Sequence, residues 1–254
     1  MIADHVLKQI TERPRLVKEP VRLVLFTTDV GCDSCPAMRD LVQAVKERLG
    51  LVRLETYDMV MDRDKSQLYG ITHVPALVIQ GANGRFVTFT GLIEDVLLDT
   101  VLMTIAAVSD QKVWFPQNVL STVSHLTNDV KVRVLVDRDC VKCRPVAETA
   151  IGLGLSSDLI AVSVIVGRDF PELIKKYRVS EIPKTIFGEN LHLDGHIPES
   201  EFLEMIFQAE GIKGGPDKKC VVCGTSSPDL ICTNCRSKIQ AESLEHKLKS
   251  ERMK

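Results

Sequence analysis

Short apolar runs alternate with segments of helical periodicity along the first half of the chain. Residues 21–27 form an apolar run typical of a buried strand. After Cys35, apolar residues at Met38, Leu41 and Val45 recur about every 3.6 residues, which predicts a helix ending at Gly50. We also predict helices over residues 3–12, 63–69 and 93–109 and strands over residues 51–58, 76–80 and 86–89. This order indicates an α/β chain, with helices on both faces of a mixed sheet.

The same pattern repeats after a shift of 108 residues, which carries Cys32 onto Cys140. The shift also carries Cys35 onto Cys143, Asp29 onto Asp137, Tyr69 onto Tyr177 and Pro75 onto Pro183. Several landmarks at one offset indicate an internal duplication. The second copy therefore predicts helices over 117–126, 141–153, 170–177 and 199–210, strands over 131–137 and 159–166, and a hairpin over 185–193.

The composition describes an ordinary globular protein. The chain has 254 residues, 44% of them hydrophobic and 26% charged, with a net charge of −2. This balance gives no indication of nucleic-acid binding. The most apolar long stretch, residues 96–108, contains Asp99 and is too short to cross a bilayer. The N-terminus does not resemble a signal peptide, so we expect a cytoplasmic protein without membrane contact.

All eight cysteines lie in C-x-x-C pairs. The first two pairs, Cys32/Cys35 and Cys140/Cys143, stand where predicted helices begin, and the N-terminus of a helix stabilises a thiolate. We expect the first cysteine of each pair to be the nucleophile and the second to resolve a mixed disulfide. The alternatives are an inert pair or a static disulfide, but a four-residue loop stabilises a fold little. Asp33 opposes a thiolate whereas Lys142 favours one, so the two sites should differ.

The C-terminal part predicts a different chemistry. Residues 211–219 have the composition of a linker, and two further C-x-x-C pairs follow within residues 220–238. Their cysteines are Cys220, Cys223, Cys232 and Cys235. Two pairs so close together predict one tetrahedral structural zinc site, as in a zinc ribbon. The segment is too short to fold without a cross-link or a bound metal ion. Iron, two local disulfides or a redox-active tail are the alternatives. Residues 239–254 form a charged tail of helical composition, which we expect to be a solvated helix; a docking surface for an acidic partner is the alternative.

Each copy resembles a thioredoxin-fold domain. The features that carry the resemblance are the C-x-x-C at a helix start and the Pro75 or Pro183 that precedes a hairpin. The tandem resembles the two-domain, glutaredoxin-like protein disulfide oxidoreductases of many thermophilic prokaryotes. Two features depart from the thioredoxin pattern: no Trp precedes either C-x-x-C, and Phe26 and Val134 replace the buried acid.

The resemblance implies two thioredoxin-fold domains, residues 1–110 and 111–210, each a mixed four-stranded sheet flanked by helices. It also implies cis peptide bonds before Pro75 and Pro183, in loops that face the dithiol and pair with the substrate backbone.

The predicted function is thiol–disulfide exchange with protein substrates through mixed disulfides. It needs no organic cofactor, and the resemblance implies an upstream reductase. Two alternatives stay open: a redox sensor or adaptor that binds a partner through the ribbon, and an electron-relay protein of a peroxide-reducing system. The sequence leaves open the direction of exchange and the oligomeric state.

Overall fold

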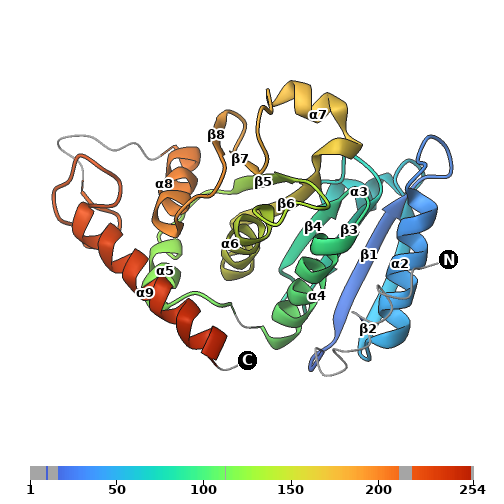
Figure 1. The fold of residues 1–254 in the computed structure, drawn as a ribbon, viewed down its shortest axis with the longest axis horizontal. Coiled ribbons are helices and arrows are strands. Elements are labelled where there is room, and N and C mark those ends of the chain that lie inside the picture. The colour runs from blue at the N-terminus through green and yellow to red at the C-terminus, as the bar shows by residue number, and fades with distance from the viewer. Residues whose placement is uncertain (1–9, 11–16, 112, 212–218, 253–254) are drawn as a thin grey trace.

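One continuous sheet of eight strands runs through the molecule (Figure 1). The computed structural model describes residue 10 and residues 17–111, 113–211 and 219–252. The first unit contains β1 (Val21–Thr27), α2 (Cys35–Arg48), β2 (Val52–Asp58), α3 (Arg63–Leu68), β3 (Ala76–Gln80), β4 (Phe86–Thr90) and α4 (Asp95–Asp110). The second contains α5 (Gln117–Val123), β5 (Val130–Val136), α6 (Cys143–Ser156), β6 (Ile160–Val166), the 3₁₀ turn η1 (Gly167–Asp169), α7 (Pro171–Lys176), β7 (Lys184–Phe187), β8 (Leu191–Asp194) and α8 (Glu199–Glu210). Helix α9 (Thr233–Arg252) ends the chain.

The two units repeat one strand arrangement. The order across the sheet is β2-β1-β3-β4 and then β6-β5-β7-β8. In each unit the first two strands are parallel, and the hairpin strand next to them is antiparallel. This confirms the predicted pair of mixed four-stranded sheets flanked by helices.

The two four-stranded sheets are also hydrogen-bonded to each other, which the sequence had not predicted. Strand β4 pairs in parallel with β6, from Val87 opposite Val162 to Thr90 opposite Ile165. At this junction Gly91 has φ +104°, and a Cβ there would lie 2.7 Å from Cβ of Val166. A side chain at Gly91 would therefore meet the second unit, whereas the equivalent Gly195 has open space around it.

Helices α2, α4, α6 and α8 cover one face of the sheet and enclose the main core, in which α4 packs against α6. The opposite face carries two smaller apolar clusters. One lies beside α3 and includes Phe26, Tyr69 and Val78; the other lies under α7 and includes Leu135 and Ile186. The sheet is thus buried on both faces around each apolar cluster, as its apolar strands require.

Most predicted elements agree with the structure within a few residues. Strands over 21–27 and 76–80 and the helix over 199–210 have the predicted bounds. The helix predicted over 3–12 lies outside the described residues, except for Ile10, which is helical and buried. Most of the linker also lies outside them. No helix in the described part of the chain is long and apolar enough to cross a bilayer.

The charged C-terminal helix is packed, contrary to our expectation of a solvated one. One face of α9 carries Ile239, which is 1% exposed, and the buried Ser243. The helix contacts α8, where Nη2 of Arg236 lies 2.6 Å from the carboxylate of Glu204. Burial raises the pKa of Glu204, and the Arg236 charge opposes that rise. The sequence did not predict this contact because the buried face of α9 is short and partly polar, so it gives no clear apolar periodicity.

We predict that Arg236→Ala lowers the free energy of unfolding by about 1–3 kcal/mol at neutral pH, because the Glu204 carboxylate, 14% exposed, would lose its counter-charge. Urea unfolding measures this. Lys249→Ala is the matched control. It removes a cation of the same helix whose ion pair with Glu245 is exposed, so it should change stability little. Equal effects of the two variants would contradict a packed α9.

Candidate redox and metal sites

The first dithiol stands at the N-terminus of α2. Cys32 and Cys35 form a disulfide, and the N–H of Cys35 donates to the carbonyl of Cys32 at 3.3 Å. Cys35 opens the helix and is fully buried, whereas Cys32 is half-buried. Pro36 occupies the first turn, where a missing N–H costs nothing. This places Cys32 where an incoming sulfur can reach it and keeps Cys35 behind it.

The second dithiol repeats this geometry at the N-terminus of α6. Cys140 and Cys143 form a disulfide, and the N–H of Cys143 donates to the carbonyl of Cys140 at 3.0 Å. Cys143 is 3% exposed and Cys140 is half-buried. In both units the first cysteine is therefore the accessible one.

Both predicted prolines follow cis peptide bonds, Val74–Pro75 and Ile182–Pro183. The sheet register explains their position. Ala76 lies opposite Phe26 on β1, so Pro75 stands beside the end of β1 from which the Cys32 loop leaves. Lys184 lies opposite Leu135 on β5, which places Pro183 likewise beside the Cys140 loop. The strand pairing thus brings each proline and its dithiol to one edge of the sheet.

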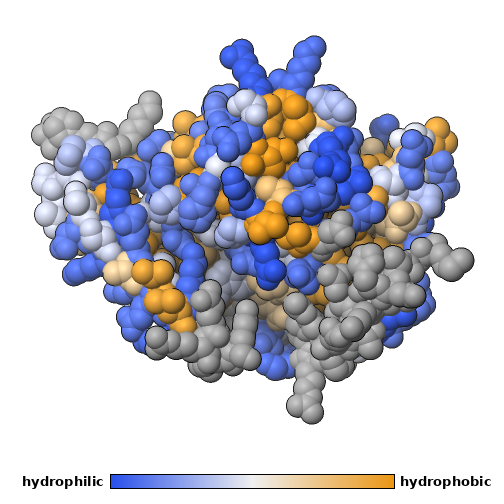
Figure 2. All heavy atoms as spheres, viewed as in Figure 1, coloured by the Kyte–Doolittle hydropathy of each residue, from blue (hydrophilic) through white to orange (hydrophobic). Residues whose placement is uncertain are grey.

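The surroundings of the two dithiols differ in polarity. Near the first, Val30, Val60 and Met61 are 85%, 53% and 83% exposed. The N–H of Met59 donates to the carbonyl of Thr27 at 2.9 Å, which holds the 59–61 turn beside the end of β1. Apolar atoms accordingly appear at the tip of the loop between β1 and α2 (Figures 1 and 2). We call Val30, Val60 and Met61 the apolar rim.

At the second dithiol, charged side chains occupy the positions equivalent to the apolar rim. The shift of 108 residues carries Val30, Val60 and Met61 onto Arg138, Arg168 and Asp169. Arg138 forms ion pairs with Asp169 and, at 3.1 Å, with Glu94 of the first unit. Arg168 lies 2.6 Å from Asp137. Aligning the two copies of the sequence reveals this difference in residue type. It does not reveal the ion pair of Arg138 with Glu94, because Glu94 is distant in sequence.

The second dithiol also lies at the junction of the two units. A small cleft beside Cys140 and Cys143 is closed by Val96, Leu97 and Thr100 of α4. Arg144, next to Cys143, lies 3.6 Å from Asp99 of the same helix. Movement between the units would therefore alter access to this dithiol.

The last four cysteines converge as predicted. The sulfurs of Cys220, Cys223, Cys232 and Cys235 all lie within 4.8 Å of one another, and none is in a disulfide. Sγ of Cys223 and Sγ of Cys232 are 3.7 Å apart. A tetrahedron with metal–sulfur bonds of about 2.3 Å has edges of about 3.8 Å, so the spacing fits a metal ion.

The backbone around these sulfurs also fits a bound metal. The N–H of Cys232 donates to Sγ of Cys220 at 3.3 Å, an interaction that stabilises a thiolate. Hydrogen bonds from Thr225 lower the pKa of Cys223 to about 6. Gly224 has φ +71°, and its N–H donates to the carbonyl of Cys220 at 2.9 Å, closing the tight turn after the first pair. Four thiolate donors with supporting amides can hold a metal ion.

Comparison with known proteins agrees with this arrangement. Residues 130–208 match the family described as Thioredoxin domain. A probable thioredoxin from Methanothermobacter marburgensis is 35% identical over 72 residues, which are 28% of this chain and 82% of that protein.

Two solved structures share the tandem fold. A protein disulfide oxidoreductase from Aeropyrum pernix is 19% identical with a TM-score of 0.74, and the match covers 82% of this chain and 94% of that one. A mutant of the alkylhydroperoxide reductase AhpF from Enterococcus faecalis is 17% identical with a TM-score of 0.73, over 81% of this chain and 99% of that one. At these identities the likeness shows the fold alone.

Proposed function

Since the chain belongs to the thioredoxin family, we propose that it is an oxidoreductase that exchanges disulfides with protein substrates at Cys32/Cys35 and Cys140/Cys143. One observation carries the proposal. Each unit combines an accessible cysteine at a helix N-terminus, a buried partner three residues later and a cis-proline at the same sheet edge. The fold alone would not require this combination twice.

The proposed reduction begins with the dithiol form. The Cys32 thiolate attacks one sulfur of a substrate disulfide, a mixed disulfide forms, and the other substrate sulfur leaves as a thiolate that takes a proton. Cys35 then attacks Sγ of Cys32, releases the second substrate thiol and closes the Cys32–Cys35 disulfide. Two electrons pass to the substrate, and an upstream reductase must restore the dithiol. Cys140 and Cys143 would act in the same way.

We assign Pro75 and Pro183 to substrate positioning. Each proline precedes an inner strand of the sheet and lies beside its dithiol loop. Each strand's pairing begins at the residue after the proline, which has no N–H to add to the ladder, so the segment before it lies outside the sheet pairing and can meet an extended substrate segment. This role would align the substrate disulfide with the accessible sulfur.

The two dithiols would have different roles, one reacting with substrate proteins and the other with the reductase. The apolar rim around Cys32 fits apolar segments of a substrate protein. At Cys140 the equivalent positions are charged and Val141, 72% exposed, is an isolated apolar side chain, so we assign this dithiol to exchange with the reductase. We also propose a cytoplasmic location, where a C-x-x-C pair is more often catalytic or metal-binding than a structural cross-link.

An electron-relay protein of a peroxide-reducing system is the second candidate, favoured by the fold shared with the Enterococcus faecalis alkylhydroperoxide reductase. Such a relay would reduce one dedicated partner quickly and general protein disulfides poorly. A redox sensor or adaptor would react once and not turn over.

The four C-terminal cysteines would hold a structural zinc ion, with iron as the alternative. Zinc bound by four thiolates fills every coordination position, so it would stabilise the segment without taking part in exchange. It would also anchor α9, which begins between Cys232 and Cys235 and contacts α8.

We predict catalytic reduction of insulin disulfides with dithiothreitol as electron donor. Cys32→Ser or Cys140→Ser alone should leave part of the rate, and the double variant should lose it. Cys35→Ser should accumulate a mixed disulfide, because attack still occurs without resolution. Normal turnover by the double variant would refute the proposal, and a single-turnover burst in the wild type would favour the adaptor.

The apolar rim gives a second prediction. In a Cys140→Ser background, Val60→Ser with Met61→Ser should raise KM for insulin about 5–30-fold, since the lost apolar contact corresponds to about 1–2 kcal/mol. Reduction of a small soluble disulfide should not change. Leu248→Ser, which alters an exposed leucine of α9, is the control and should change neither rate. An unchanged KM would contradict the proposal that the apolar rim beside Cys32 binds substrate proteins.

We predict about one zinc ion per chain by elemental analysis of reduced protein. Cys232→Ser should lose the metal, because a tetrahedral site needs four ligands. Cys32→Ser should retain it, which controls for adventitious binding to thiols. A preparation purified without chelators that contains no metal would refute the site, and stoichiometric iron would replace zinc by the alternative.

A further inference from the structure

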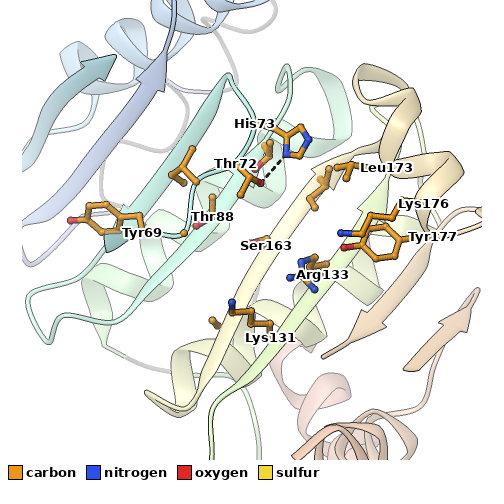
Figure 3. A pocket seen from close by; sticks show the side chains of 15 residues that line it. Tyr69, Thr72, His73, Thr88, Lys131, Arg133, Ser163, Leu173, Lys176 and Tyr177 are labelled. Atoms are coloured by element: carbon orange, nitrogen blue, oxygen red, sulfur yellow. Dashed lines mark hydrogen bonds between the residues drawn. The ribbon is translucent and has the colours of Figure 1, made fainter. Parts of the chain in front are cut away.

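A cavity of about 440 Å³ lies on the α3/α7 face of the sheet, between the two apolar clusters (Figure 3). Its floor is the middle of the eight-stranded sheet. Here β4, β6 and β5 present Thr88, Ser163, Lys131 and Arg133, whereas the clusters on either side are apolar. Packing alone would favour apolar residues at the centre of a sheet. The polar floor therefore calls for another explanation.

The strand register aligns these polar side chains in one row. Thr88 lies opposite Ser163, and Ser163 lies opposite Arg133. Residues directly opposite one another share a face of the sheet, so the two hydroxyls and the guanidinium lie side by side. Lys131, two residues before Arg133, points to the same face. The row crosses the junction, because Thr88 belongs to the first unit and the other three residues to the second.

Both units also supply the walls. Lys176 and Tyr177, at the end of α7, stand on one side, and Thr72 and His73 on the other (Figure 3). The His73 ring packs on Phe170 with centroids 5.1 Å apart, and its Nε2 lies 3.2 Å from Glu172. His73 of the first unit is thus in contact with two residues of the second unit. The cavity walls are thereby held together.

The charge around the cavity is one-sided. Lys131, Arg133 and Lys176 line it, and none of the lining residues that the structure describes is acidic. Nη1 of Arg133 donates to the carbonyl of Gly188 at 2.8 Å, and its Nη2 lies 3.5 Å from the exposed Glu189. Lys131 and Lys176 form no ion pair with any described residue. The whole chain has a net charge of −2, so this concentration of cations is local. Three cations around a hollow repel one another unless an anion joins them.

We propose that this cavity, the cation pocket, binds a small phosphorylated molecule. Each Nη nitrogen of Arg133 carries two N–H groups, so the guanidinium keeps donors for a phosphate beside its contacts with Gly188 and Glu189, and the lysines add point charges. Thr88 and Ser163 offer hydroxyl donors for further phosphate oxygens. The volume suits a metabolite and not a polymer, and Ile165 and Leu173 offer an apolar wall for the rest of the molecule. The proposal is independent of the thiol chemistry.

Titration calorimetry with inorganic pyrophosphate at near-physiological salt tests the pocket in the full-length protein. We expect saturable binding of one pyrophosphate per chain. A ligand held by both units should also raise the melting temperature. Lys131→Ala with Lys176→Ala should weaken binding at least about tenfold, because two charge-assisted contacts are lost. Lys175→Ala is the matched control, since it removes an adjacent cation of α7 that does not line the pocket.

Three results would overturn the proposal. These are no saturable binding, equal weakening by Lys175→Ala, and equally tight binding of citrate, which would point to carboxylates instead of phosphate. If the double variant fails to fold, Lys176→Ala alone alters an exposed side chain and serves the same purpose. Insulin reduction by the pocket variants, measured alongside, separates a failure here from a failure of the redox proposal.

Discussion

The parallel pairing of β4 with β6 determines most of the distinctive features of this molecule. A strand at the edge of a sheet leaves backbone groups unpaired, and joining the hairpin strand β4 to β6, the parallel edge strand of the second unit, satisfies the groups of both. The register of this pairing then determines which residues of the two units lie next to each other at the junction. It holds α4 against the second dithiol, brings Gly91 next to Val166 and aligns Thr88 with Ser163 and Arg133. Two separate thioredoxin-fold domains on a flexible tether would have none of these contacts.

The junction also explains how two copies of one unit came to differ. The cysteines, their helix N-termini and the cis-prolines depend on contacts inside each unit, so both copies keep them. The surroundings depend on neighbours. At the second dithiol the neighbour is the first unit, and Arg138 pairs with Glu94 of that unit as well as with Asp169 of its own. At the first dithiol the equivalent position is Val30, which is 85% exposed.

The C-terminal segment obtains its stability in two ways. Its own core is small, with Leu230, Ile231 and Ile239 as the fully buried apolar residues. Four converging thiols allow a metal ion to supplement that core. The helix that follows contacts α8 through Arg236 and Glu204, so the segment is attached to the second unit by side chains and not by the chain connection alone.

The sequence by itself determined the elements, the duplication and the chemistry of the cysteines. Apolar periodicity and C-x-x-C spacing act within a few residues, so Val21–Thr27 and Glu199–Glu210 could be located without any tertiary information. The convergence of Cys220 with Cys235 followed for the same reason. Only the tertiary structure decided that the two sheets are one, that α9 packs on α8, and that Lys131, Arg133 and Lys176 surround one cavity. Those facts depend on which strand edges meet and on charges brought together from distant segments, and no local pattern encodes either.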